Sequence, residues 1–297
     1  MCVREYSAIR HMAYSLFLGH DQRRIWMGMY SAYFDAAGSF NPKHPDKGSQ
    51  DALVVSGYVT SKHRWLKFEK KWNTVLVEAG ITVPFHMTDF MYNGKNFKDW
   101  KDREPEKIPL LMVLARLIRK HVTKAIGEGV LIGDWKRVNK IYALDRNHCT
   151  PFALAGFFVL EKTMRWVGNH HDNKIKTAIV FEDGDAGKGD LMWTMEQVRK
   201  KVPLLIPKGV LQFADKDLVQ FQACDFVAWE KRQEFGNRLC LPLEAYPGPS
   251  EPLQELWKLD RDWGYSDYGS LIAFCEQYDV PKIGEDREWD GVVKQTY

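Results

Sequence analysis

Cysteine is scarce in this chain, and the few cysteines are placed where they exclude two classes of protein. There are five cysteines among 297 residues, they are widely spaced, and none forms a CxxC pair. An odd number at wide spacing predicts neither a disulfide framework nor a cysteine zinc site. We therefore expect a protein of a reducing compartment, the cytoplasm.

Long apolar runs and a large excess of one charge are also lacking. The longest apolar run, residues 151–160, stops at Glu161, well short of the ~18 residues that a membrane helix needs. The 42 Lys and Arg residues stand against 39 Asp and Glu residues, a formal net charge of +3. We therefore expect no membrane partner, and any contact with nucleic acid must come from a local basic face.

The hydrophobic content, at 45% of the chain, is sufficient for one large folded domain and excludes a disordered chain. Residues 1–26 show no periodicity, so we expect a leader that is not part of the core. The folded domain is then predicted at 27–235, with a helical insert at 61–122 and a C-terminal appendage at 236–297.

The order of predicted elements indicates the fold class. β-branched runs predict strands, and apolar residues at helical spacing between capping residues predict helices. Ser61 and Asp217 are expected as N-caps, and Gly80 as the glycine that ends a helix. Residues 81–107 read as irregular, and 240–297 as two short helices. Strands are predicted at 31–40, 51–60, 124–132, 174–181 and 210–214, and helices at 61–79, 110–121, 151–167, 190–201 and 218–234. Without the insert, this order predicts an α/β fold with the mixed sheet of a ribonuclease H-like protein, flanked by helices.

Carboxylates follow two of these strands and interrupt one helix. Asp35 ends the first strand, while Glu182, Asp183 and Asp185 follow the buried strand at 174–181. Asp225 lies in an apolar helical stretch, where a carboxylate is costly unless it is paired, protonated or bound to a metal. Carboxylates are the ligands that Mg²⁺ prefers, and two such ions can promote phosphodiester hydrolysis.

Each of these acids also has a purely structural interpretation. Asp35 can serve as a turn former before Gly38, and residues 182–185 can be a polar connection between strand and helix. Strand alternation puts Glu182 and Asp183 on opposite faces, so that only one of them can face Asp35. Asp225 can be the buried partner of a lysine.

Five segments resemble one protein family: YFDAAGSF, the strand that holds Gly57, FHMTDF, VFEDGD and QACDFVAWE. They are similar to the bacterial domain-of-unknown-function family 3800, over residues 29–235. The resemblance implies a ribonuclease H-like fold and nuclease activity. It also implies an acidic set made of Asp35, Glu182 and Asp225, and it ranks Glu182 ahead of its acidic neighbours. Ala36 and Ala37 stand where the family has Glu and Ser.

The predicted site follows from the acids and the resemblance together. The predicted cofactor is Mg²⁺ or Mn²⁺, and the predicted substrate is DNA or RNA. The predicted metal ligands are Asp35, Glu182, Asp183 and Asp225. The predicted catalytic residues are Asp35, Glu182, Asp225 and His86, of which His86 could orient water or a phosphate. Secondary candidates are Asp89, Asp185 and Gln222. His86 can equally be a core histidine, and Asp89 a turn cap.

One side of the helix predicted at 61–79 is basic, and two interpretations of that side stay open. It is either a solvated surface or a face that follows the phosphates of a nucleic acid. Its residues are Lys62, Arg64, Lys67, Lys70 and Lys71, with His63 among them. The chain is thus predicted to be a metal-dependent nuclease. The alternatives are an inactive ribonuclease H-like module that binds nucleic acid or protein, and a phosphoesterase that acts on a small nucleotide.

Overall fold

The computed structural model describes residues 30–40, 52–170, 177–184, 187–201, 211–240 and 243–285. The predicted leader, the loop at 41–50 and Asp185 lie outside the described residues. Within the described ranges, no helix is both long enough and apolar enough to cross a membrane.

Six strands form one mixed sheet in the order β5-β4-β1-β2-β3-β6. β1, β2 and β3 pair antiparallel in succession, whereas β4 lies parallel to β1, β5 parallel to β4 and β6 parallel to β3. The strands are β1 (Tyr30–Ala37), β2 (Ala52–Ser61), β3 (Lys124–Leu131), β4 (Thr177–Glu182), β5 (Leu211–Ala214) and β6 (Arg261–Ser266). The predicted α/β class with a mixed sheet is confirmed.

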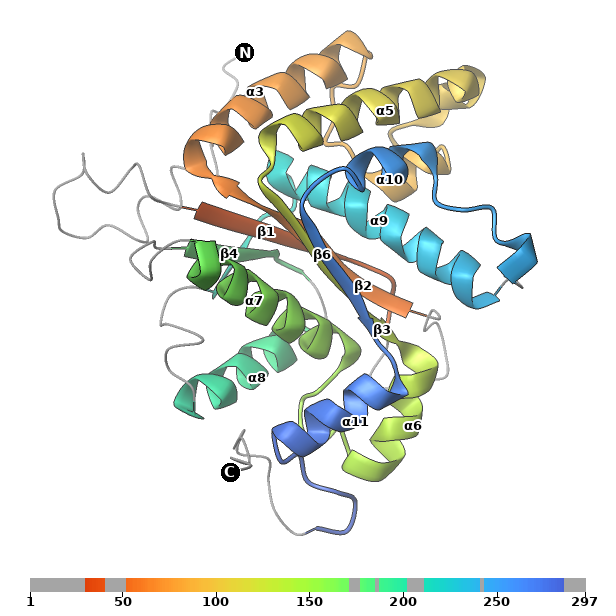
Figure 1. Cartoon of the computed structure of the whole chain (residues 1–297). Helices are drawn as coiled ribbons and strands as arrows, with labels where there is room; N and C mark the ends of the chain where they lie inside the picture. Colours follow the sequence, from red (N-terminus) through yellow and green to blue (C-terminus); the bar gives the residue numbers. More distant parts are fainter. Residues whose placement is uncertain are drawn as a thin grey trace, which may run out of the picture.

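Helices cover both faces of this sheet (Figure 1). α3, α5, α9 and α10 lie on one face, and α6, α7, α8 and α11 lie on the other. The helices are α3 (Lys62–Glu78), α4 (Met87–Met91), η2 (Lys98–Arg103), α5 (Glu104–His121), α6 (Ile132–Tyr142), α7 (Pro151–His170), α8 (Lys188–Lys201), α9 (Val219–Cys240), η3 (Leu243–Ala245), α10 (Glu251–Leu256) and α11 (Tyr268–Gln277).

The core on the α9 face is built largely from aromatic side chains. Trp65, Phe68 and Trp72 recur at helical spacing along α3 and are buried against the sheet and α9. The indole Nε1 of Trp65 donates to the carbonyl oxygen of Ser31 at 2.9 Å. This bond ties α3 to β1, so the position of α3 relative to the sheet is set by a buried polar contact as well as by apolar packing.

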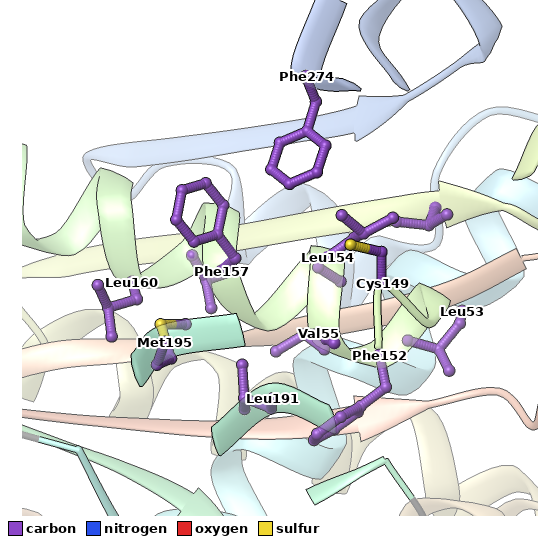
Figure 2. Close-up of a cluster of buried hydrophobic side chains, with 14 of the residues drawn as sticks. Leu53, Val55, Cys149, Phe152, Leu154, Phe157, Leu160, Leu191, Met195 and Phe274 are labelled. Atoms are coloured by element: carbon purple, nitrogen blue, oxygen red, sulfur yellow. The ribbon is translucent and has the colours of Figure 1, made fainter. Parts of the chain in front are cut away.

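The core on the opposite face centres on α7, whose first half, residues 151–160, is apolar on all sides. Figure 2 shows Phe152, Phe157 and Leu160 of this helix beside Leu191 and Met195 of α8. A helix that is apolar all round must be buried, which explains why α8 and α11 cover it. The resulting two-sided burial of β4 agrees with its continuous apolar run, Ala178 to Phe181.

Several local predictions need correction. Residues 81–107 are not irregular, because they contain α4, η2 and the first turn of α5. α6 was not predicted, although Ile132, Trp135, Val138 and Tyr142 recur at helical spacing and are buried. Ser61 occupies the N-cap position of α3, but its side chain makes no capping hydrogen bond.

The end of α3 agrees with its prediction, whereas the C-terminal segment does not. α3 ends as expected: Gly80 has φ +80°, and Ile81 N–H donates to the Leu76 carbonyl oxygen at 2.8 Å, the pattern of a Schellman motif. The segment 236–297 holds more than short helices. It continues α9 and supplies β6, which extends the sheet beside β3.

Gly57, in the middle of β2, offers a test of how tightly the sheet packs. A Cβ atom at this position would lie 1.8 Å from the carbonyl oxygen of Tyr33 and 2.8 Å from Cδ1 of Phe34. Because both neighbours belong to β1, Gly57→Ala must shift the strand pair. We expect it to lower the free energy of unfolding by about 3 kcal/mol in a urea titration.

Gly236→Ala is the matched control for this prediction. Gly236 lies inside α9, and a Cβ there would have no atom within 4 Å apart from its own helix. Alanine should therefore stabilise the protein by about 0.5–1 kcal/mol. Equal effects of the two substitutions would contradict the packing described for β1 and β2.

Candidate functional site

Two acids leave the sheet side by side on the α9 face. Phe34 of β1 pairs with Phe181 of β4 in parallel register, and both rings belong to the α7 core. The next residues, Asp35 and Glu182, must point to the opposite face because side chains alternate along a strand. Adjacent strands lie about 4.8 Å apart, so these two carboxylates are neighbours.

α9 brings the third acid to the same place. Cys224 is fully buried, and its Sγ contacts the carbonyl oxygen of Tyr33 at 3.1 Å. Burial raises the pKa of the Cys224 thiol, and the charges of Asp35, Glu182 and Asp225 raise it further. All three predicted acids are therefore within electrostatic reach of one buried thiol, with Asp225 on the helix and the other two on the sheet.

Asp225 is buried, with 8% of its surface exposed. Its Oδ2 accepts the backbone N–H of Met87 at 2.6 Å, and its Oδ1 lies 4.0 Å from Nε2 of His86. Burial raises the pKa of this carboxyl; the charge of His86 and the Met87 N–H oppose that rise, and the charge of Asp89 adds to it. Its recorded partners are thus a backbone amide and a distant imidazole, which argues against the lysine pairing considered from the sequence.

The start of α4 positions the predicted histidine. His86 is the N-cap residue of this helix, and its Nδ1 accepts the backbone N–H of Asp89 at 3.5 Å. When the imidazole is neutral, an accepting Nδ1 leaves the proton on Nε2, the nitrogen nearer to Asp225. The side chain of His86 is 56% exposed, so it is not the core histidine that the sequence left open.

A pocket of about 470 Å³ lies beside these side chains, although Asp35 is not among the residues that line it. Glu182 and Asp225 line it together with His86 and Asp89. Two further polar residues line the pocket, Asn96 and Lys216, and neither was predicted from the sequence. Lys216 lies between Asp215 and Asp217, in the turn that precedes α9, and the N-cap predicted at Asp217 gave no reason to single out the lysine.

The remaining candidates, Asp183, Asp185 and Gln222, differ in where the structure places them. Asp183 is exposed and forms an ion pair with Lys188 at 2.7 Å, so it does not share the pocket with Glu182. Asp185 lies outside the described residues. Gln222 lines the pocket, and its Oε1 accepts the indole N–H of Trp72 at 2.9 Å.

The acids do not form a closed metal cage. Among the described residues, no group of three or more His, Cys, Asp and Glu side chains is arranged so that it could hold a metal ion as it stands. The donors are nevertheless of the type that Mg²⁺ and Mn²⁺ prefer, and Mg²⁺ usually takes only one or two protein carboxylates, with water and substrate phosphate completing its shell. The residues fit an open site that a substrate completes.

The predicted basic face on α3 is only partly exposed. Lys62 is buried, which contradicts its placement on that face, and Arg64 donates to the backbone oxygen of Lys120 at 2.8 Å. Lys67, Lys70 and Lys71 are exposed.

The basic face of α3 starts near the first residue of β1, whereas Asp35 lies near the last residue of that strand. Ser61, just before α3, pairs with Tyr30, five residues from Asp35, which places the start of α3 about 16 Å away along the strand. Burial lowers the pKa of His121, and Lys120, Arg64, Lys67 and Lys71 lower it further. The cationic surface therefore continues from α3 onto the end of α5.

Comparisons of the chain with family models, with curated proteins and with solved structures found no match. The family resemblance and the activity it implies therefore remain predictions. The site rests on the geometry of its own residues.

A second buried carboxyl on α9 provides a reference for Asp225. Glu230 does not line the pocket, is 3% exposed, and accepts the hydroxyl of Ser250 at 2.5 Å. Burial raises the pKa of Glu230 to about 7, and the bond from Ser250 opposes the rise. Both acids thus bind protons more readily in the folded protein than in the unfolded chain.

A raised carboxyl pKa makes folding stability fall as the pH rises from the unfolded value toward the folded one. Glu230→Gln removes this loss, so we expect a gain on the order of 3 kcal/mol at pH 8 and little change below pH 4.5. Asp225→Asn should change stability in the same direction, because the amide oxygen can still accept the Met87 N–H. Urea titrations from pH 4 to pH 8 measure both.

The two variants should differ only when Mn²⁺ is added. Mn²⁺ should raise the melting temperature of the unsubstituted protein and of Glu230→Gln, but not of Asp225→Asn, since a ligand that binds the folded state stabilises it. A sharp loss of stability in Asp225→Asn without metal, combined with an intact Mn²⁺ shift, would remove Asp225 from the site.

Proposed function

We propose that this chain hydrolyses phosphodiester bonds of nucleic acid with the help of Mg²⁺ or Mn²⁺. The observation that carries the proposal is that Asp35 and Glu182 lie near the ends of neighbouring strands, that α9 packs over these strands and carries Asp225, and that the charges of all three acids act on the thiol of Cys224. Like charges that lie close together are costly, more so where they are shielded from water as at Asp35 and Asp225, and a divalent cation would offset that cost.

The sheet supports a ribonuclease H-like interpretation of the fold. β3, β2 and β1 form an antiparallel set, and β4 and β5 then extend the sheet on the other side of β1 in parallel. This is the mixed arrangement expected from the order of elements in the sequence. The acids lie at the carboxyl ends of β1 and β4, where the chain moves to the opposite side of β1, a common place for ligand sites in α/β sheets.

Each residue has a role that its position permits. Asp35, Glu182 and Asp225 would hold the cation, which when bound supplies a Lewis acid for the phosphate and lowers the pKa of a bound water. His86 presents Nε2 toward Asp225 at the pocket and is placed to orient a water or a phosphate oxygen. Lys216 brings a positive charge to the pocket wall, where it can pair with a phosphate.

An inactive binding module is the second candidate, and a specific observation favours it. Asp35 Oδ1 accepts the N–H of Ala36 at 2.7 Å, and Asp225 Oδ2 accepts that of Met87. Each of these acids therefore uses one oxygen on a backbone amide. Ala36 also stands where the similar family has a further acid, which reduces the negative charge available to a cation.

Hydrolysis of bis(p-nitrophenyl) phosphate and of labelled single- and double-stranded DNA and RNA tests the proposal. We expect turnover that requires Mn²⁺ or Mg²⁺, and a loss of at least about 100-fold in Asp225→Asn, because a ligand should matter no less than the residues that support ligands. Glu230→Gln, which changes a buried acid on the same helix, should retain activity. Metal-dependent binding without turnover would favour the inactive module, and equal loss in both variants would contradict the assignment of Asp225.

The surface of Lys67 and Lys71 distinguishes a polymeric substrate from a small one. If duplex DNA passes over it, the logarithm of the binding constant should fall with the logarithm of salt concentration, and Lys67→Ala with Lys71→Ala should flatten that slope by about two units. Fluorescence anisotropy at several salt concentrations measures the slope. An unchanged slope would assign these lysines to ordinary solvated surface.

A further inference from the structure

A second hollow adjoins the acidic pocket. Its volume is about 500 Å³, and it lies between the second half of α3, the segment 81–84 and the start of α9. Pro84, Asp217 and Gln222 line both hollows. The two volumes are therefore neighbouring compartments that meet at these shared residues.

The boundary between them is held in place. Trp72 of α3 donates its indole N–H to Oε1 of Gln222, and Nε2 of Gln222 donates to the carbonyl oxygen of Asp217 at 3.4 Å. Both amide atoms of Gln222 are thus used within the protein. The partition between the compartments is preorganised instead of being formed by a ligand.

The second hollow is lined by apolar side chains and by a few polar ones. The polar side chains Glu69, Asn73 and Gln220 face it from α3 and α9. The apolar lining consists of Leu76, Val77, Ile81, Val83, Pro84, Leu218 and Val219. Val77 is 65% exposed, so this wall of the hollow borders on solvent.

Two of the polar groups are neighbours on the wall of this hollow. Gln220 is only 1% exposed, and Glu69 is half-buried. Burial raises the pKa of Glu69, and a hydrogen bond from the Gln220 side chain lowers it. The contact is loose, because within the described residues neither Nε2 of Gln220 nor Oε2 of Glu69 has a partner with good hydrogen-bond geometry. The carboxyl and amide groups can therefore still bond to a ligand in the hollow.

We propose that this hollow binds a nucleobase, guanine, of the nucleotide next to the scissile phosphate. The proposal rests on the proposed function for the identity of the phosphate site. Apolar walls suit the faces of a flipped base, and carboxyl and amide groups suit its hydrogen-bonding edge. The carboxylate of Glu69 accepts two adjacent N–H groups, which guanine presents on its Watson–Crick edge and adenine does not. The hollow's size lies within the range of roughly 300–1,000 Å³ that is usual for small ligands.

The order of the two compartments matches the order of groups in a nucleotide. Lys216 and two of the acids line the first compartment, where a phosphate would lie, while Glu69 and Gln220 line the second. The ribose would pass beside Asp217 and Gln222, which line both. Substrate recognition is thus assigned to α3 and the start of α9, and hydrolysis to β1, β4 and the middle of α9.

Binding of mononucleotides to the full chain tests the base site without requiring catalysis. Calorimetry in EDTA compares guanosine 5′-monophosphate, adenosine 5′-monophosphate and ribose 5-phosphate. Asn73→Trp fills the hollow from an exposed position of α3, and Thr74→Trp places the same side chain on the next exposed residue, which does not line it. Glu69→Gln tests whether the Glu69 carboxylate binds the N–H groups on the Watson–Crick edge of the base.

We expect guanosine monophosphate to bind at least tenfold more tightly than ribose 5-phosphate or adenosine monophosphate. Asn73→Trp should abolish the advantage over ribose 5-phosphate, Thr74→Trp should keep it, and Glu69→Gln should abolish the preference over adenosine monophosphate. The proposal is overturned if the unsubstituted chain does not favour the guanine nucleotide, or if the two tryptophan variants behave alike. Hydrolysis of bis(p-nitrophenyl) phosphate, which has no base, reports separately on catalysis, so a failure of turnover with the binding pattern intact would refute the enzyme and not the base site.

Discussion

The parallel register of β1 and β4 is the constraint on which the site depends. Phe34 and Phe181 pair and point into the α7 core, so their successors, Asp35 and Glu182, must both point toward α9. A slip of one residue in either strand would send one acid to the other face. Because the α7 core is densely aromatic on that face, the hydrophobic packing of one side of the sheet keeps two carboxylates together on the other.

α9 buries a carboxylate, and the desolvation of that charge costs free energy that an apolar helix would not lose. Its buried stretch carries Cys224, whose thiol fixes the helix against Tyr33, and directly after it Asp225. An aliphatic residue at 225 would pack without desolvating a charge. The retained carboxylate, held by a single backbone N–H within a polar pocket, is the kind of local conflict between stability and function that marks sites in natural proteins.

Much of the sheet could be predicted from the sequence, because periodicity and turn residues are local signals. The strands that became β1 to β5 and the helices α3, α7, α8 and α9 were expected at nearly their observed positions. β6 was not, since Arg261–Ser266 is half-exposed, charged at its start and interrupted by Gly264, and only its pairing with β3 defines it as a strand. The candidate site, too, could be predicted only in part. Its acids could be expected from the ends of strands and from the resemblance. The burial of Lys62, the separation of Asp183 from Glu182 and the roles open to Lys216 and Glu69 depend on contacts distant in sequence.

Anomalous X-ray diffraction from crystals of the full chain soaked in Mn²⁺ tests the central claim most directly. We expect a manganese peak held by carboxylate oxygens of Asp35, Glu182 and Asp225 beside the pocket that His86 and Lys216 line, and no such peak in crystals of Asp225→Asn. A peak held by other residues, or unchanged occupancy at this site in the variant, would contradict it.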